Sequence, residues 1–163
     1  QDDEDDEEAE GQQPVAIDPE DGTEEVSDKH LPLLIRLQKM NIAEKLRLAV
    51  VGNAAARALL VRDPNRNVAM AVIASPAIAE REVAAIVRSR EVSDEILRYV
   101  ANRRKWLRNH EIKHGLVFNP KTPVGISMRF VNHLRSNELR ALARSRSVPQ
   151  PLRTAAVNKL NRH

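Results

Sequence analysis

The stretch 117–123, Val-Phe-Asn-Pro-Lys-Thr-Pro, holds the sharpest pattern in this chain of 163 residues. We expect Asn119-Pro120 to stop a helix that starts near Asn109, because a proline disfavours helical geometry in the residue before it. Thr122-Pro123 opens the next helix, since proline is favoured where helices begin. Apolar residues recur at helical spacing on both sides. The stretch therefore predicts two helices joined by a short polar turn.

Similar turns occur elsewhere in the chain. The segments 75–79, 89–93, 119–123 and 145–149 each hold a small polar residue, two variable positions, a β-branched residue and then Ala, Ser or Pro. Their starts lie 14, 30 and 26 residues apart, and each is followed by a helical pattern. Hydrophobic periodicity predicts about ten helices of roughly 8–13 residues and no strand. Helices this short are marginal alone, so the sequence predicts that they stack side by side.

Local signals set the expected helix starts. Asn41, Asn53 and Ser93 are expected to act as N-caps, because short polar side chains accept hydrogen bonds from the first free N–H groups of a helix. Pro64 is expected at the first helical position of its segment.

The 119–123 turn resembles the helix end and turn of HEAT-like and leucine-rich-repeat-variant α-solenoids, whose units often have an apolar residue, Asn, Pro, any residue, Thr and Pro before a helix. The resemblance covers roughly residues 41–160 and includes the stretch 63–72 as the preceding helix of such a unit. It implies an all-α, right-handed α-solenoid of helix–turn–helix units. It also implies a binding scaffold without chemistry, although some HEAT-like proteins bind DNA along a basic concave face.

The charge is divided between two regions. Residues 1–28 hold 14 acids and no Lys or Arg, whereas residues 29–163 hold the other 9 acids and all 26 bases, a net charge of +17. We expect residues 1–28 to be a disordered acidic arm and residues 29–163 to be the helical-repeat domain. The arm is either a solubilising linker or a segment that competes intramolecularly for the partner site of the basic domain.

Composition excludes several classes. The chain has no cysteine, so it has no disulfide framework and no thiol-based site. Aromatic residues make up only 2%, which disfavours a stacking platform for single-stranded nucleic acid. The sequence shows neither a signal peptide nor an apolar run of membrane-spanning length, which predicts a cytoplasmic protein without a membrane partner.

Residues 110–114 match the H-E-x-x-H pattern of zinc hydrolases, in which two histidines on one helix face hold Zn²⁺ and the glutamate activates water. A third ligand would have to be His133 or Glu138, and no specific motif surrounds either one. Lys113 would also place a cation beside the metal. We therefore predict that His110 and His114 are polar rim residues, and we predict no metal, cofactor or catalytic residue.

The densest basic stretch, 98–108, supports two interpretations. It is either an anion-binding patch in which Trp106 or Tyr99 stacks beside a guanidinium, or a solvated helix end in which Trp106 fills the core. A second group is arginines at matched places beside Ser89 and Ser145, which would line up in a stacked array. The predicted partner-binding residues are Arg88, Arg90, Arg98, Arg103, Arg104, Lys105, Trp106, Arg108, Arg140, Arg144 and Arg146.

Three functions follow in order of preference. The first is a non-enzymatic scaffold that binds an acidic protein segment through an Arg-rich face, because arginine forms paired hydrogen bonds with carboxylates and phosphates. The second is a helical array that contacts nucleic-acid phosphates without base specificity. The third and most distant is a zinc hydrolase that uses His110, Glu111 and His114.

Overall fold

The structure is a computed structural model that describes residues 32–162. The predicted acidic arm, residues 1–28, lies outside the described residues. The described residues belong to two units, which meet between residues 38 and 39 of the chain: residues 32–38 belong to the first unit and residues 39–162 to the second. Helix α1 (Leu33–Lys39) makes up most of the described part of the first unit.

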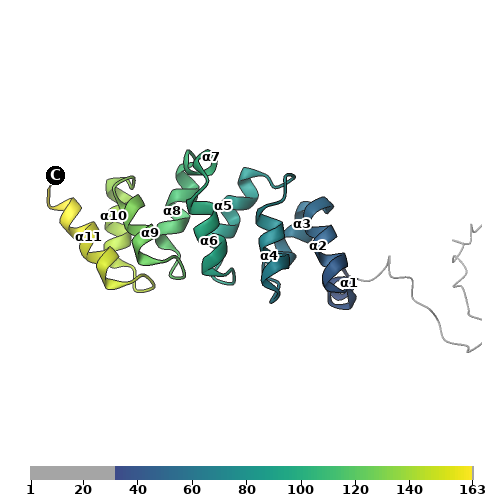
Figure 1. Cartoon of the computed structure of the whole chain (residues 1–163). Helices are drawn as coiled ribbons and strands as arrows, with labels where there is room; N and C mark the ends of the chain where they lie inside the picture. The colour runs from purple at the N-terminus through teal and green to yellow at the C-terminus, as the bar shows by residue number, and fades with distance from the viewer. Residues whose placement is uncertain (1–31, 163) are drawn as a thin grey trace, which may run out of the picture. The chain divides into compact units, whose positions relative to one another are not determined.

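The described residues form eleven helices and no strand, which confirms the all-α prediction. Figure 1 shows helices α2 to α11 following one another in chain order along the second unit. Their bounds are α2 (Ile42–Val51), α3 (Ala54–Leu60), α4 (Arg66–Ile73), α5 (Glu80–Arg88), α6 (Asp94–Ala101), α7 (Arg104–Leu107), α8 (His110–Phe118), α9 (Val124–Val131), α10 (Ser136–Arg144) and α11 (Gln150–Leu160). None of the helices within residues 32–162 has the length and apolarity needed to cross a membrane.

Eight of these helices form four consecutive pairs, α3/α4, α5/α6, α8/α9 and α10/α11. The two helices of each pair are joined by five residues, 61–65, 89–93, 119–123 and 145–149. The predicted turn 75–79 differs from the other three, because it lies between α4 and α5 and so connects one pair to the next. Its counterpart within the α3/α4 pair is the segment 61–65.

Capping explains several helix starts. The side-chain Oδ1 of Asn41 accepts a hydrogen bond from the Glu44 N–H at 2.9 Å, and the Glu44 carboxylate accepts one from the Asn41 N–H at 3.1 Å. Asn53 Oδ1 accepts from the Ala56 N–H at 2.9 Å. Both predicted caps are confirmed. Ser93 occupies the N-cap position of α6, but its side chain makes no capping bond.

One local prediction is wrong. Helix α4 begins at Arg66 instead of Pro64, because Asn65 Oδ1 accepts from the Asn67 N–H at 2.9 Å and so sets the first turn after the proline. The four-residue helix α7, within the basic stretch 98–108, was not predicted. A helix of one turn is too short to show a hydrophobic period.

The buried residues come mainly from one apolar stripe on each helix. Side chains that are less than 2% exposed include Leu60 on α3, Ile96 and Leu97 on α6, and Leu116 on α8. Each stripe is covered by neighbouring helices, because α4 packs on α2 and α6, α8 packs on α5 and α9, and α11 packs on α9 and α10. Packing between helices therefore stabilises elements that are too short to be stable alone.

Polar contacts between neighbouring pairs recur at a similar sequence separation. The carboxylate of Glu80 accepts from the Asn109 amide, 29 residues later, at 3.3 Å. The guanidinium of Arg129 donates to the Ala101 carbonyl oxygen, 28 residues earlier, at 3.3 Å. The ammonium of Lys159 donates to the Asn132 carbonyl oxygen, 27 residues earlier, at 2.8 Å. Two of these contacts join the α5/α6 pair to the α8/α9 pair, and the third joins the α8/α9 pair to the α10/α11 pair.

Candidate anion-binding surface

Acidic residues are unevenly distributed along the second unit. Residues 39–111 contain 14 Lys or Arg and 8 Asp or Glu, whereas residues 112–163 contain 10 Lys or Arg and the single acid Glu138. The ion pairs that Lys or Arg make with carboxylates within residues 40–162 all precede residue 112. The cations of the later residues are therefore left to neutral partners or to solvent.

A small cationic pocket lies where α5, α8 and α10 end. It has a volume of about 270 Å³, and Arg88, Arg90 and His114 line it together with the hydroxyl-bearing Ser145 and Ser147. None of the described residues lining it is a carboxylate. Because Arg88 and Arg90 are both exposed, their guanidinium groups can contact a ligand from outside. Such a pocket attracts an oxyanion by charge and can hold it by several hydrogen bonds.

Asn119 fixes the backbone that carries the two arginines. Its side-chain amide donates to the carbonyl oxygen of Val87 at 2.7 Å and to that of Ser89 at 2.8 Å, and the residue is 3% exposed. Its Oδ1 accepts from the Lys121 N–H at 3.0 Å, so the amide group is bonded on both sides. Arg88 and Arg90 therefore extend from a backbone that is held on both sides of Arg88.

Close helix packing supports the same wall of the pocket. A Cβ atom at Gly115 on α8 would lie 2.5 Å from a methyl carbon of Val87 on α5. Glycine is therefore required for this approach of the two helices. Across the pocket, Arg90 donates to the Ser147 hydroxyl at 3.0 Å and so joins two connections that are 57 residues apart.

The structure places the predicted arginines in separate groups. Arg88 and Arg90 line the pocket, and Arg144 and Arg146 flank Ser145 in sequence and are exposed. Arg140 is also exposed, one turn earlier on α10 than Arg144. The arginines that were predicted at matched places beside Ser89 and Ser145 thus lie at two interhelical connections. The Arg90–Ser147 hydrogen bond joins these two connections.

The predicted residues from the stretch 98–108 lie at the other end of α6 and on α7. The guanidinium of Arg98 pairs with Asp94 at 3.3 Å, and that of Arg103 lies 4.2 Å from the centre of the Tyr99 ring. Trp106 is only 5% exposed, so its ring packs in the core, and the Lys105 ammonium lies 5.2 Å from its centre. Arg104 and Arg108 are exposed. This group is separate in sequence and in lining residues from the Arg88–Arg90 pocket.

The H-E-x-x-H residues open helix α8 beside α10. His110 Nε2 lies 2.8 and 2.9 Å from the two carboxylate oxygens of Glu138, and the His114 ring stacks on Phe118 with a centre distance of 4.3 Å. Burial lowers the pKa of His114; the charge of Glu138 opposes this shift, and the positive charges of His110 and Arg88 add to it. No group of three or more His, Asp or Glu side chains among residues 32–162 is arranged to hold a metal ion. His133 is exposed and lies near Phe130 instead.

Burial alone would raise the pKa of Glu138, but hydrogen bonds from the Arg135 N–H and from His110 lower it overall. These side chains line a second depression, which shares Arg88 and His114 with the cationic pocket. The histidines thus border the candidate anion-binding pocket, next to a depression that also contains the carboxylates of Glu111 and Glu138.

Sequence reasoning missed the role of Asn119, His114 and Ser147 in shaping this pocket. The Asn-Pro turn marked Asn119 as a helix stop, but its contacts with residues 87 and 89 depend on tertiary packing. Comparison of the chain with protein-family models, curated proteins and solved structures found no match. The HEAT-like resemblance stays a prediction.

Proposed function

We propose that this chain is a non-enzymatic helical-repeat scaffold that binds an acidic segment of a protein partner through its arginine-rich face. The observation that carries the proposal is the pocket formed by Arg88, Arg90 and the two serines, which lacks a carboxylate and is held by Asn119. Carboxylates are the acidic groups that proteins themselves offer to such a pocket.

A HEAT-like α-solenoid is the architecture that we propose for the second unit. Four helix pairs with five-residue connections support it, and so does the spacing of contacts between pairs. The Arg62–Glu91 and Arg66–Glu95 ion pairs both join residues 29 apart, and the His110–Glu138 bond joins residues 28 apart. Regular contact between successive units is the hallmark of repeat arrays.

The test uses the full chain and a fluorescein-labelled polyglutamate peptide, with binding measured by fluorescence anisotropy. The double variant Arg88→Gln/Arg90→Gln is expected to weaken binding by about tenfold, or roughly 1.4 kcal/mol. Arg47→Gln/Arg162→Gln removes the same charge from exposed sites outside the pocket and is expected to weaken binding by less than about twofold, since distant charges are screened by salt. Equal effects of the two double variants would refute a specific pocket.

A second candidate function is contact with nucleic-acid phosphates. It is favoured by the exposed Arg104 and Arg108 and by Arg103, which extend the cationic surface to the other end of α6. Random duplex DNA added as a competitor distinguishes the two functions. Displacement of the peptide at physiological salt, with an affinity that falls steeply as salt rises, would favour nucleic acid over an acidic protein segment.

A further inference from the structure

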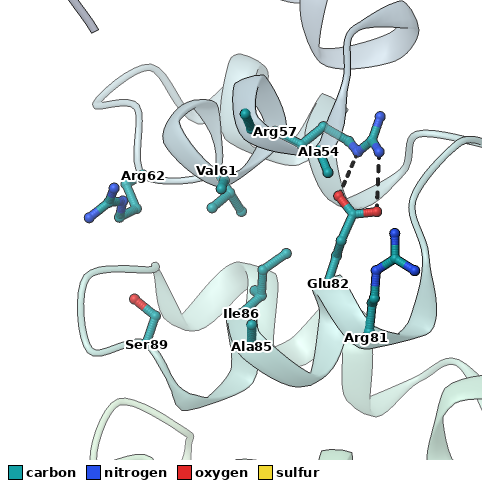
Figure 2. Close-up of a pocket in the computed structure, with 11 residues that line it drawn as sticks. Ala54, Arg57, Val61, Arg62, Arg81, Glu82, Ala85, Ile86 and Ser89 are labelled. Atoms are coloured by element: carbon teal, nitrogen blue, oxygen red, sulfur yellow. Dashed lines mark hydrogen bonds and ion pairs between the residues drawn. The ribbon is translucent and has the colours of Figure 1, made fainter. Parts of the chain in front are cut away.

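An apolar groove of about 590 Å³ lies between helices α3 and α5, shown in Figure 2. Small and aliphatic side chains form most of its lining, namely Ala54, Ala55, Ala58, Val61, Ala85 and Ile86. Its volume lies within the range of about 300–1,000 Å³ that is usual for ligand pockets. The groove is therefore large enough to take one or more aliphatic side chains.

The groove is preformed because ion pairs hold its two walls in place. Arg57 on α3 donates to both carboxylate oxygens of Glu82 on α5, at 2.8 and 3.1 Å, and to the Gly52 carbonyl oxygen at 2.6 Å. The Arg57 hydrogen bonds lower the pKa of Glu82, which keeps the carboxylate ionised. Near the other end of the groove, Arg62 forms an ion pair with Glu91. The helices therefore do not need to move to admit a ligand.

One arginine at the rim of this apolar surface is left without a carboxylate partner among the described residues. Figure 2 shows Arg62 and Ser89 at one end of the groove and Arg81 beside the Arg57–Glu82 pair at the other. Of the three arginines in the lining, Arg57 pairs with Glu82 and Arg62 pairs with Glu91. Arg81 is exposed and makes no ion pair within residues 32–162. An occupant that presents aliphatic side chains between carboxylates would match both the floor and the rim.

Neighbouring residues of the chain line the groove and the cationic pocket. Ser89 lines the groove, whereas its neighbours Arg88 and Arg90 line the pocket on the α8 side. Asn119 holds the carbonyl groups of Val87 and Ser89, so the backbone between the two sites is fixed. The two sites therefore adjoin in sequence at residues 88–90, which makes one bound segment that spans both the simplest arrangement to test.

We propose that the groove between α3 and α5 binds aliphatic side chains of the acidic protein segment whose carboxylates occupy the Arg88–Arg90 pocket. This inference rests on the proposed function and narrows it. The partner is an acidic segment with aliphatic residues among its carboxylates, and the chain distinguishes it from a uniformly acidic segment.

Two labelled peptides test the inference on the full chain. One carries a central pair of leucines between runs of glutamate, and the other has serines in place of the leucines. The leucine peptide is expected to bind at least about tenfold more tightly, because partial burial of two leucines contributes on the order of 1.4 kcal/mol or more. Equal affinities would overturn the inference while leaving the proposed function intact. Failure of both peptides to bind would overturn both.

A groove-filling variant provides the second measurement. Ala85 lines the groove and is exposed, so Ala85→Phe is expected to fill the groove without strain in the core. This variant should bind the leucine peptide no more tightly than the serine peptide, and its affinity for the serine peptide should equal that of the wild-type chain. Ala43→Phe, at an exposed position on α2, is the matched control and should preserve the advantage.

Three results for Ala85→Phe would overturn the inference. They are a retained leucine advantage, an equal loss of binding for both peptides, and a fall in the sedimentation mass of the free chain, which would assign the groove to a second copy. If Ala85→Phe melts at a lower temperature than the wild-type chain, Ala58→Phe, at another exposed groove position, is the replacement variant. In either case, equal affinities of the two peptides for the wild-type chain would overturn the inference without any variant.

Discussion

The α3/α4 and α5/α6 pairs and the pairs that follow them use similar packing but different partners for their cations. In the earlier region, Arg62 and Arg66 pair with Glu91 and Glu95, each 29 residues later. Arg90, within the α5/α6 pair, already departs from this pattern, because it bonds the hydroxyl of Ser147. In the later region, Arg153 bonds the carbonyl oxygens of Ser145 and Val148. Arg62 and Arg66 are thus paired with carboxylates of the next helix pair, whereas Arg90 and Arg153 bond neutral groups and keep their positive charge.

One position shows how this difference arises. Arg62 and Arg90 are both second in their five-residue connections, and Glu91 is third in the connection that follows Arg62. The residue third in the connection after Arg90 is Lys121. A lysine thus stands where an ion-pair partner for Arg90 would be expected. The fold tolerates this exchange because exposed ion pairs contribute little to stability.

The largest expected effect concerns the most buried ion pair of the earlier region. Arg57 is 6% exposed and is bonded to Glu82 and to the Gly52 carbonyl. Arg57→Ala is expected to lower the free energy of unfolding by about 3 kcal/mol, because it leaves a mostly buried carboxylate without its partner. Urea unfolding followed by circular dichroism measures this loss. The exposed Arg47→Ala should leave the midpoint unchanged, and a loss below about 1 kcal/mol for Arg57→Ala would contradict the role given to the pair.

The next effect concerns Asn119, which connects the pocket to the fold. Asn119→Ala removes two hydrogen bonds to buried or partly buried carbonyl groups. We expect a loss of about 1–3 kcal/mol in unfolding free energy and weaker binding of the polyglutamate peptide, since Arg88 and Arg90 lose their fixed backbone. Asn137→Ala, at an exposed position on α10, serves as the control. If the folded Asn119→Ala chain binds the peptide as tightly as the wild-type chain, Asn119 does not support the binding role of Arg88 and Arg90.

A charge exchange tests the comparison between the regions directly. Lys121→Glu restores an acid at the place that corresponds to Glu91, where it can pair with Arg90. We expect polyglutamate binding to weaken by about tenfold while stability changes by less than about 0.5 kcal/mol. Arg47→Glu makes the same change in net charge at a remote exposed site and should have a smaller effect. If both variants weaken binding equally, net charge alone explains the attraction.

The sequence predicted the features that depend on local chemistry. Asn41 and Asn53 were predicted as caps because their partners lie three residues away, and the Asn-Pro turn correctly ended α8 at Phe118. Helix α7 was missed because one turn has no measurable period. The start of α4 was predicted at Pro64 but lies at Arg66, because the side chain of Asn65 caps the helix.

The candidate site was predicted only in part. Arg88 and Arg90 were identified from their matched places beside serines, and the structure brings them into one pocket. The clamp by Asn119 and the groove between α3 and α5 were not predicted, because both depend on which helix faces lie together. Trp106 was left open between a binding and a core role, and its 5% exposure shows that burial of its ring prevailed.

The smallest expected effect compares two carboxylates of the earlier region by pH. Hydrogen bonds from Arg57 and from Arg66 lower the pKa of Glu82 and of Glu95, respectively, below the ordinary value of 4.5. A carboxyl group with a lowered folded-state pKa stabilises the fold above its unfolded-state pKa, and this contribution is lost as the pH falls through the folded-state pKa. The melting-temperature gap between the wild-type chain and Glu82→Gln should therefore be widest near neutral pH and shrink below about pH 4.5.

The two variants should differ in their response to salt. The Glu95 side chain is 37% exposed and that of its partner Arg66 is 68% exposed, whereas the Arg57 and Glu82 side chains are 7% and 14% exposed. Added salt screens exposed pairs more strongly than partly buried ones. Any melting-temperature difference between the wild-type chain and Glu95→Gln should therefore be small and disappear in high salt. Most of the melting-temperature difference caused by Glu82→Gln should remain. A Glu82→Gln gap that widens on acidification, or one that salt removes, would show that burial does not distinguish these two ion pairs.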